Sequence, residues 1–140
     1  MTSLLPLLFA VFLQMSPAPM APMATLARDL MSGIDEPRQS VARSAAEWTK
    51  LWREHAGDKP VPKVNFATRT VLAVFLGTRP SAGYAVEIVG TRAEGTGLVV
   101  LWSERQPERD MVSAQILTSP SHIVTVPRVA GAIRFEKASQ

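Results

Sequence analysis

The stretch 70-TVLAVFL-76 decides the fold of this chain, because it is nearly continuous apolar sequence and contains the longest apolar run beyond the first 27 residues. An apolar run of this length that ends at Gly77 predicts a strand with both faces buried. Such a strand belongs at the centre of a domain. The rest of the chain must therefore supply an apolar layer for each of its faces.

Shorter β patterns follow this strand. Over Tyr84–Ile88 one face is apolar and the other, with Glu87, is partly wet; over Leu98–Trp102 apolar side chains alternate between the two faces. The turn-forming residues 94-EGTG-97 lie between these runs, so a hairpin is expected. Further strands are predicted at Met111–Thr118, His122–Val126 and Ala132–Glu136. Because the links between these runs are short, an antiparallel meander is expected.

A short strand at Gln39–Arg43 and one amphipathic helix precede the apolar run. Ser44 and Glu47 have the spacing of a capping box, in which the hydroxyl accepts from the Glu47 amide and the carboxylate reaches the Ser44 amide. The predicted helix begins at Ala45 and is stopped by Gly57. Its apolar stripe, which we expect to anchor it on the sheet, consists of Trp48, Leu51, Trp52 and His55.

These patterns predict a mostly β (α+β) domain. The expected architecture is an antiparallel β-sandwich or a partly closed barrel of six to seven strands with one short amphipathic helix. A chain of 140 residues, 46% of them hydrophobic, is long enough for one such domain with its own core.

The first 27 residues carry no charged side chain. The apolar run Leu4–Leu13 is too short to span a bilayer, and small residues and prolines follow it, as in an export signal. We expect a signal peptide at residues 1–27 that is cleaved after Ala27; the alternative is an apolar arm. Residues 28–38 are then a flexible tether and residues 39–140 the folded domain, which would be periplasmic or extracellular.

The absence of cysteine and the spread of charge narrow the classes of partner and modification. Without cysteine we expect no disulfide, no thiolate zinc site and no lipoprotein anchor. The net charge is +3, but the arginines are spread along the chain instead of clustering with aromatic residues. This distribution indicates a solvated surface, so we expect no nucleic-acid partner, and no integral membrane span.

Few residues have the arrangement that catalysis needs. The two histidines, His55 and His122, are far apart in the sequence, and no His-Glu-x-x-His or Gly-x-Ser-x-Gly pattern occurs. Ser121 precedes His122, but neighbouring strand residues point to opposite faces. We therefore expect no enzyme activity, no metal and no cofactor, with each histidine a half-buried polar group. The alternative, a hydrolase, would need a pocket where a serine, a histidine and a carboxylate converge.

Residues 77-GTRPSAGY-84 have the features of a recognition loop. Its two glycines permit positive φ, its proline stiffens the backbone, and arginine and tyrosine are enriched at binding hot spots. The predicted partner-binding residues are Gly77, Arg79, Pro80, Ser81, Gly83 and Tyr84. The alternative is a structural turn whose Tyr84 packs over a neighbouring strand.

Four stretches of the chain resemble the PrcB C-terminal domain family in their residues, order and spacing. These stretches are 46-AEWTKLW-52, 64-VNFATRTVLAVFLG-77, 79-RPSAGYAVEI-88 and 119-SPSHIVTVPR-128. The chain departs from the family at Asn65, where aspartate is common, and at Ser81 and Ala82, where the family has threonine and glycine. The first departure weakens any carboxylate role, and the second leaves a less flexible turn.

The resemblance implies an exported, non-catalytic domain that binds or stabilises another envelope or secreted protein, such as a subtilisin-like protease. The 77–84 loop also resembles, more distantly, a loop of chagasin-type cysteine-protease inhibitors, which are small β-sandwiches. A protease inhibitor that acts through Gly77–Tyr84 is therefore the alternative function.

Overall fold

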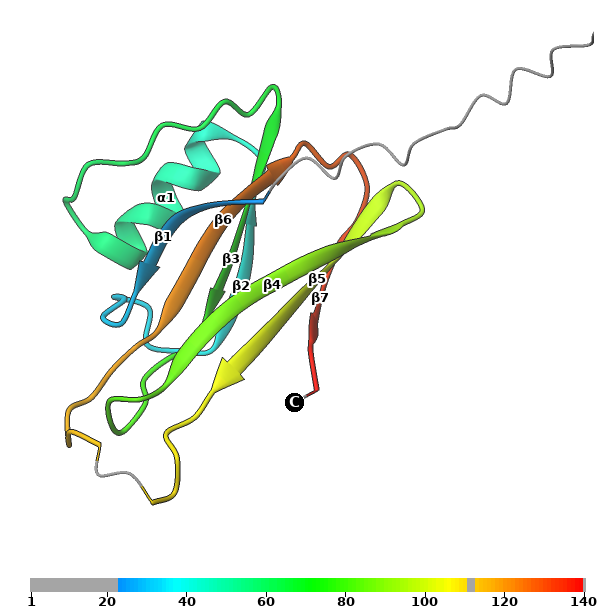
Figure 1. Cartoon of the computed structure of the whole chain (residues 1–140). Coiled ribbons are helices and arrows are strands. Elements are labelled where there is room, and N and C mark those ends of the chain that lie inside the picture. Colours follow the sequence, from blue (N-terminus) through cyan, green and yellow to red (C-terminus); the bar gives the residue numbers. More distant parts are fainter. Residues whose placement is uncertain (1–22, 111–112, 140) are drawn as a thin grey trace, which may run out of the picture.

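The computed structural model describes residues 23–110 and 113–139, which form two β-sheets and one helix (Figure 1). The elements are β1 (Ala24–Asp29), β2 (Arg38–Ala42), α1 (Ala45–Ala56), β3 (Arg69–Phe75), β4 (Ala85–Glu94), β5 (Gly97–Arg105), β6 (Ser121–Pro127) and β7 (Ile133–Lys137). The strand orders are β1-β6-β3-β2 and β4-β5-β7. The predicted mostly β sandwich with one short helix is confirmed, and its sheets do not close into a barrel.

β3 lies at the centre of the molecule, as its apolar sequence predicts. Its side chains alternate between two hydrophobic clusters, and almost all of them are buried. Those that pack with the helix are Val71, Ala73 and Phe75, and those between the two sheets are Leu72 and Val74, followed by Leu76 just beyond the strand. The four-stranded sheet is therefore a middle layer, with α1 on one face and the second sheet on the other (Figure 1).

Helix α1 has the predicted bounds and the predicted buried stripe. The Ser44 hydroxyl accepts a hydrogen bond from the Glu47 amide at 3.2 Å, as expected for its cap. The Glu47 carboxylate, however, accepts from the Arg43 amide at 2.9 Å, so the reciprocal bond goes one residue further back than predicted. Among the residues that the structure describes, no helix has the length and apolarity needed to cross a membrane.

The segment predicted as a tether is part of the fold, so this prediction is wrong. β1 pairs antiparallel with β6, and Ile34 is buried in the helix-side cluster. The predicted cleavage after Ala27 would cut through β1. The remainder of the predicted signal peptide, residues 1–22, lies outside the described residues. Local patterns did not predict β1 because its stability comes from pairing with a strand near the other end of the chain.

Two strand predictions near the C-terminus also need correction. Residues 113–117, in the predicted strand Met111–Thr118, form no strand; Thr118 makes only an isolated bridge to Arg79, and residues 111–112 are outside the described part. The apolar residues at 116 and 117 are exposed, so their pattern does not reflect a buried face. β7 pairs parallel, not antiparallel, with β5, because the chain crosses from one sheet to the other after β6.

Candidate functional site

The predicted recognition loop, residues 77–84, joins β3 to β4 at one end of the sandwich (Figure 1). Gly77 and Gly83 have φ values of +76° and +97°, which confirms the predicted positive φ. A Cβ at Gly77 would lie 2.7 Å from the carbonyl oxygen of Asp35, so this buried glycine serves packing and not partner contact. Pro80 and Gly83 are exposed, and they are the predicted residues most accessible to a partner.

Arg79 is held by an ion pair within the domain. Its Nε and Nη2 atoms each lie 2.9 Å from Oε1 of Glu104 on β5. Glu104 is only 7% exposed and also pairs with Lys137. Burial acts to raise the pKa of Glu104, but the hydrogen bonds and positive charges of Arg79 and Lys137 outweigh it and hold that pKa below its ordinary value. Arg79 therefore fixes the loop to the second sheet.

Tyr84 packs on the same anchor. The centroid of its half-buried ring lies 5.9 Å from the Arg79 guanidinium carbon, within reach of a cation–π contact. The ring also packs against the cluster between the sheets. Ser81 is half-buried, and its carbonyl accepts a hydrogen bond from the Thr118 hydroxyl at 2.9 Å. Much of the predicted recognition set therefore has a structural role.

Thr118 and Ser119 join this loop to a second surface segment. Arg79 and Thr118 exchange two backbone hydrogen bonds, of 2.7 and 3.0 Å. The Ser119 amide donates to the carbonyl of Leu30 at 2.7 Å. These bonds place three segments side by side at this end of the sandwich, namely residues 30–32, 77–84 and 116–119.

Four large apolar side chains are exposed on two of these segments, and we call them the apolar quartet. Their exposed fractions are 54% for Leu30, 67% for Met31, 50% for Ile116 and 64% for Leu117. Among the described residues, Val89 (48%) is the one further large apolar side chain of comparable exposure. Single exposed apolar residues are ordinary, whereas a group of them at one end of a domain is typical of a binding surface.

Sequence reasoning missed the apolar quartet. Leu30 and Met31 belong to the segment predicted as a tether, and the other two members belong to a predicted strand, where apolar residues are expected to be buried. The available signal was the dipeptides 32-SG-33 and 119-SP-120, which are typical of loops and follow closely after each apolar pair. The candidate site thus combines the predicted loop with an unpredicted apolar surface.

A serine, a histidine and a carboxylate do converge, although at a different place from the recognition loop. His55 Nδ1 lies 2.8 Å from Ser32 Oγ, and His55 Nε2 lies 3.0 Å from Asp29 Oδ2. These distances are within the hydrogen-bond reach of a nucleophile, a base and an orienting acid. The cluster is therefore the one arrangement on the described chain that tests the hydrolase alternative.

The surroundings of this cluster suit a structural role. Ser32 and His55 are only 7% and 4% exposed, and the Ser32 hydroxyl already accepts a hydrogen bond from the Ile34 amide at 3.1 Å. The amides of Ser32 and Gly33 donate to carbonyls of the fold, so neither is free to stabilise an oxyanion. We interpret the cluster as a network that ties β1 and the following turn to α1.

His122 is buried as well, at 1% exposure, so both histidines are more buried than predicted. Its Nδ1 accepts a hydrogen bond from the Ile88 amide of β4 at 2.8 Å, which joins the two sheets. Desolvation by burial, with a smaller contribution from the positive charge of Arg28, lowers the pKa of His122 to about 4.

The described residues contain no group of three or more histidine, aspartate or glutamate side chains that could hold a metal ion.

The strands that carry the loop are also those with a recognisable family relation. The family model described as PrcB C-terminal matches residues 70–127, which run from β3 to β6. The resemblance to the PrcB C-terminal family is confirmed.

The PrcB C-terminal match is narrower than the resemblance expected from sequence, because it begins after α1 and ends before β7. It includes the 77–84 loop and two members of the apolar quartet, Ile116 and Leu117. Comparison with curated proteins and with solved structures gave no match.

Proposed function

We propose that this chain is an exported, non-catalytic domain that binds another envelope or secreted protein. The contact surface is the end of the sandwich where the 77–84 loop meets the apolar quartet. The observation that carries this proposal is the exposure of the quartet on segments that hydrogen bonds hold beside the loop.

Physical chemistry favours a protein partner at this end. Covering exposed apolar surface stabilises a complex by roughly 25 cal/mol per Å² before the costs of association. The quartet can supply the apolar centre of an interface, and the exposed Pro80 and Gly83 can supply its edge. The resemblance to the PrcB C-terminal family, which matches residues 70–127, implies a secreted protease or a protease-associated protein as the partner.

The surface is tested with Met31→Asp and Leu117→Asp, and with Val89→Asp as the matched control at an exposed apolar position outside the quartet. The partner is identified by cross-linking in the native envelope fraction and then purified for titration. We expect each quartet variant to bind it at least ten-fold more weakly, and the control to stay within about two-fold of wild type. Equal binding by all variants would overturn the proposed surface.

The inhibitor alternative is tested by titrating the domain against papain-like and subtilisin-like proteases. Stoichiometric loss of activity that disappears in the Arg79→Ala, Tyr84→Ala double variant would establish inhibition through the loop. If the proteases keep full activity in an excess of the domain, the hypothesis that it inhibits these enzyme classes is wrong, and partner binding remains as the proposed function.

The non-catalytic assignment is tested with a fluorophosphonate, which labels activated serines. We expect no labelling of wild type, because Ser32 is buried and hydrogen-bonded. Labelling of wild type that is absent in Ser32→Ala would instead establish a hydrolase.

Export is tested by cell fractionation and by sequencing the N-terminus of the mature chain. Because β1 begins at Ala24, we expect the exported chain to start before that residue. A chain found only in the cytoplasm would contradict export.

A further inference from the structure

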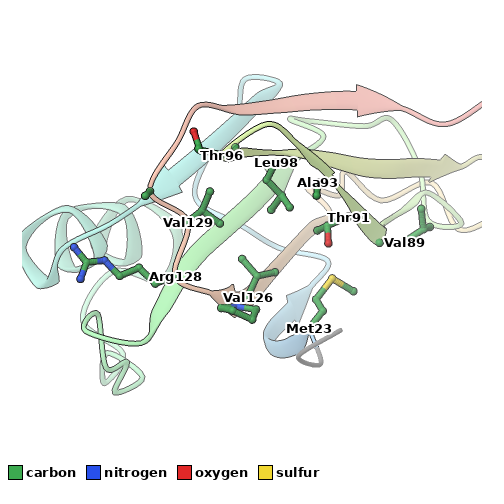
Figure 2. Close-up of a pocket in the computed structure, with 13 residues that line it drawn as sticks. Met23, Val89, Thr91, Ala93, Thr96, Leu98, Val126, Arg128 and Val129 are labelled. Atoms are coloured by element: carbon green, nitrogen blue, oxygen red, sulfur yellow. The ribbon is translucent and has the colours of Figure 1, made fainter. Parts of the chain in front are cut away.

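A cavity lies at the end of the sandwich opposite the 77–84 loop. Its volume is about 650 Å³, and it is partly open to solvent between the two sheets. Ligand sites for small molecules typically have volumes of about 300–1,000 Å³. The side chains that surround this space come from both sheets, from the residue before β1 and from the segment after β6, and they include Met23, Thr91, Leu98, Val126 and Val129 (Figure 2).

One wall of the cavity is residues 128–132, which we call the strap, and hydrogen bonds fix it to both sheets. The Val129 amide donates to Thr70 Oγ1 at 3.1 Å, and the Gly131 amide donates to a carbonyl in the β4–β5 turn, also at 3.1 Å. The guanidinium of Arg43 donates to the carbonyls of Val129 and Gly131. The strap cannot fold into the cavity without breaking these bonds, so the cavity is preformed.

The chemistry of the walls favours an alkyl chain. Most of the lining side chains are apolar, and the side-chain hydroxyls among them belong to Thr91 and Thr96. A ligand with several polar groups would leave most of them without partners, which costs free energy on burial. Ordered water has the same difficulty, because each buried water needs two to four polar partners.

The charge at the rim favours an anionic head group. Among the described lining residues there is no carboxylate, and Arg128 is the one ionised side chain. Arg128 is exposed and extends from the rim, away from the apolar walls (Figure 2). No ion pair joins it to a carboxylate in the described part of the chain. An arginine in this state is suited to bind a carboxylate.

We propose that this cavity binds a free single-chain alkyl carboxylate, whose tail lies between the sheets and whose carboxylate lies at the rim beside Arg128. The site is at the opposite end of the sandwich from the proposed protein-binding surface. Either proposal can therefore fail without affecting the other.

The probe for this proposal is dodecanoate, added below its micelle-forming concentration to the ¹⁵N-labelled protein and followed by amide chemical shifts. Thr91→Phe fills the cavity, and Ala93→Phe is a second filling variant in case the first does not fold. Thr78→Phe is the matched control, because Thr78 is exposed on the opposite loop. Dodecanol and phosphatidylglycerol vesicles test whether the carboxylate and the free ligand are required.

In wild type we expect shifts at Thr91, Leu98 and Val129. The filling variants should bind at least ten-fold more weakly, the control within about two-fold, and Arg128→Ala roughly two- to five-fold more weakly, as for an exposed ion pair. The site is overturned if wild type shows no shifts or if the filling variants bind like the control. If dodecanol binds as tightly as dodecanoate, the proposed requirement for a carboxylate is wrong. If the protein binds only to the vesicles, the proposal that the ligand is a free molecule is wrong.

Discussion

The histidine that joins the two sheets should make the stability of this domain depend on pH. His122 accepts the Ile88 amide only while its Nδ1 is unprotonated. Its pKa is about 4 in the folded state, against 6.5 in the unfolded chain. Between about pH 6.5 and pH 4 the unfolded state therefore binds a proton that the folded state does not. The stabilisation is fully present above pH 6.5 and is lost as the pH falls through 4.

The magnitude follows from this difference. One pKa unit corresponds to about 1.4 kcal/mol, so His122 should account for a loss of about 3 kcal/mol in unfolding free energy between pH 7 and pH 4. Urea unfolding across this range measures the loss. In His122→Asn the side-chain oxygen can replace Nδ1 as the acceptor but does not titrate, so its profile should be flatter by the same amount.

The control is His55→Asn, which removes the other imidazole and retains His122. This variant should still lose the unfolding free energy that His122 accounts for between pH 7 and pH 4. The ring proton shifts of His122 in NMR spectra give its folded-state pKa directly. A midpoint near 6.5, or parallel stability profiles for wild type and His122→Asn, would refute the reasoning.

Three further predictions concern the backbone, the N-terminus and the loop anchor, each measured by urea unfolding. Gly77→Ala should cost roughly 2–4 kcal/mol, because both its φ and the contact with Asp35 oppose a Cβ, whereas Gly95→Ala, with φ of +61° and no atom nearby, should cost only about 1 kcal/mol. A chain that starts at residue 28 should be less stable than one that starts at residue 23 by roughly 2–4 kcal/mol, because it lacks most of β1 and its packing on the core; equal stability would show that β1 contributes little. Arg79→Ala should cost roughly 1–3 kcal/mol, since it removes a cation that pairs with the buried Glu104 carboxylate.

The elements that could be predicted from sequence are those whose signal is local. β3 was predictable because an apolar run with no polar break requires cover on both faces, and α1 because Ser44, its buried stripe and Gly57 all agree. The positive φ of the two loop glycines was predictable for the same reason, since glycine is the residue type that permits it without strain and both glycines lie in a turn. In each case the chemistry of neighbouring residues is sufficient.

The elements that were missed depend on residues far away in the chain. β1 exists because β6 offers it a free edge, and a sequence window around Ala24 contains no sign of β6. The exposed pair Ile116 and Leu117 follows the strand pattern, but the described residues 113–117 form no strand. The apolar quartet was missed because it forms only when Thr118 and Ser119 join segments that are distant in sequence.

The central place of β6 has a consequence for how the chain folds. β6 lies between β1 and β3, so the four-stranded sheet is incomplete until residues 121–127 are available. Until then β1 has no partner, and β3 exposes one whole edge. Pairings between residues so far apart in sequence form slowly, because a long loop must close before any contact rewards it. A chain emerging from the ribosome should therefore stay open until nearly all of it has been made, and a product truncated before Ser121 should not fold at all.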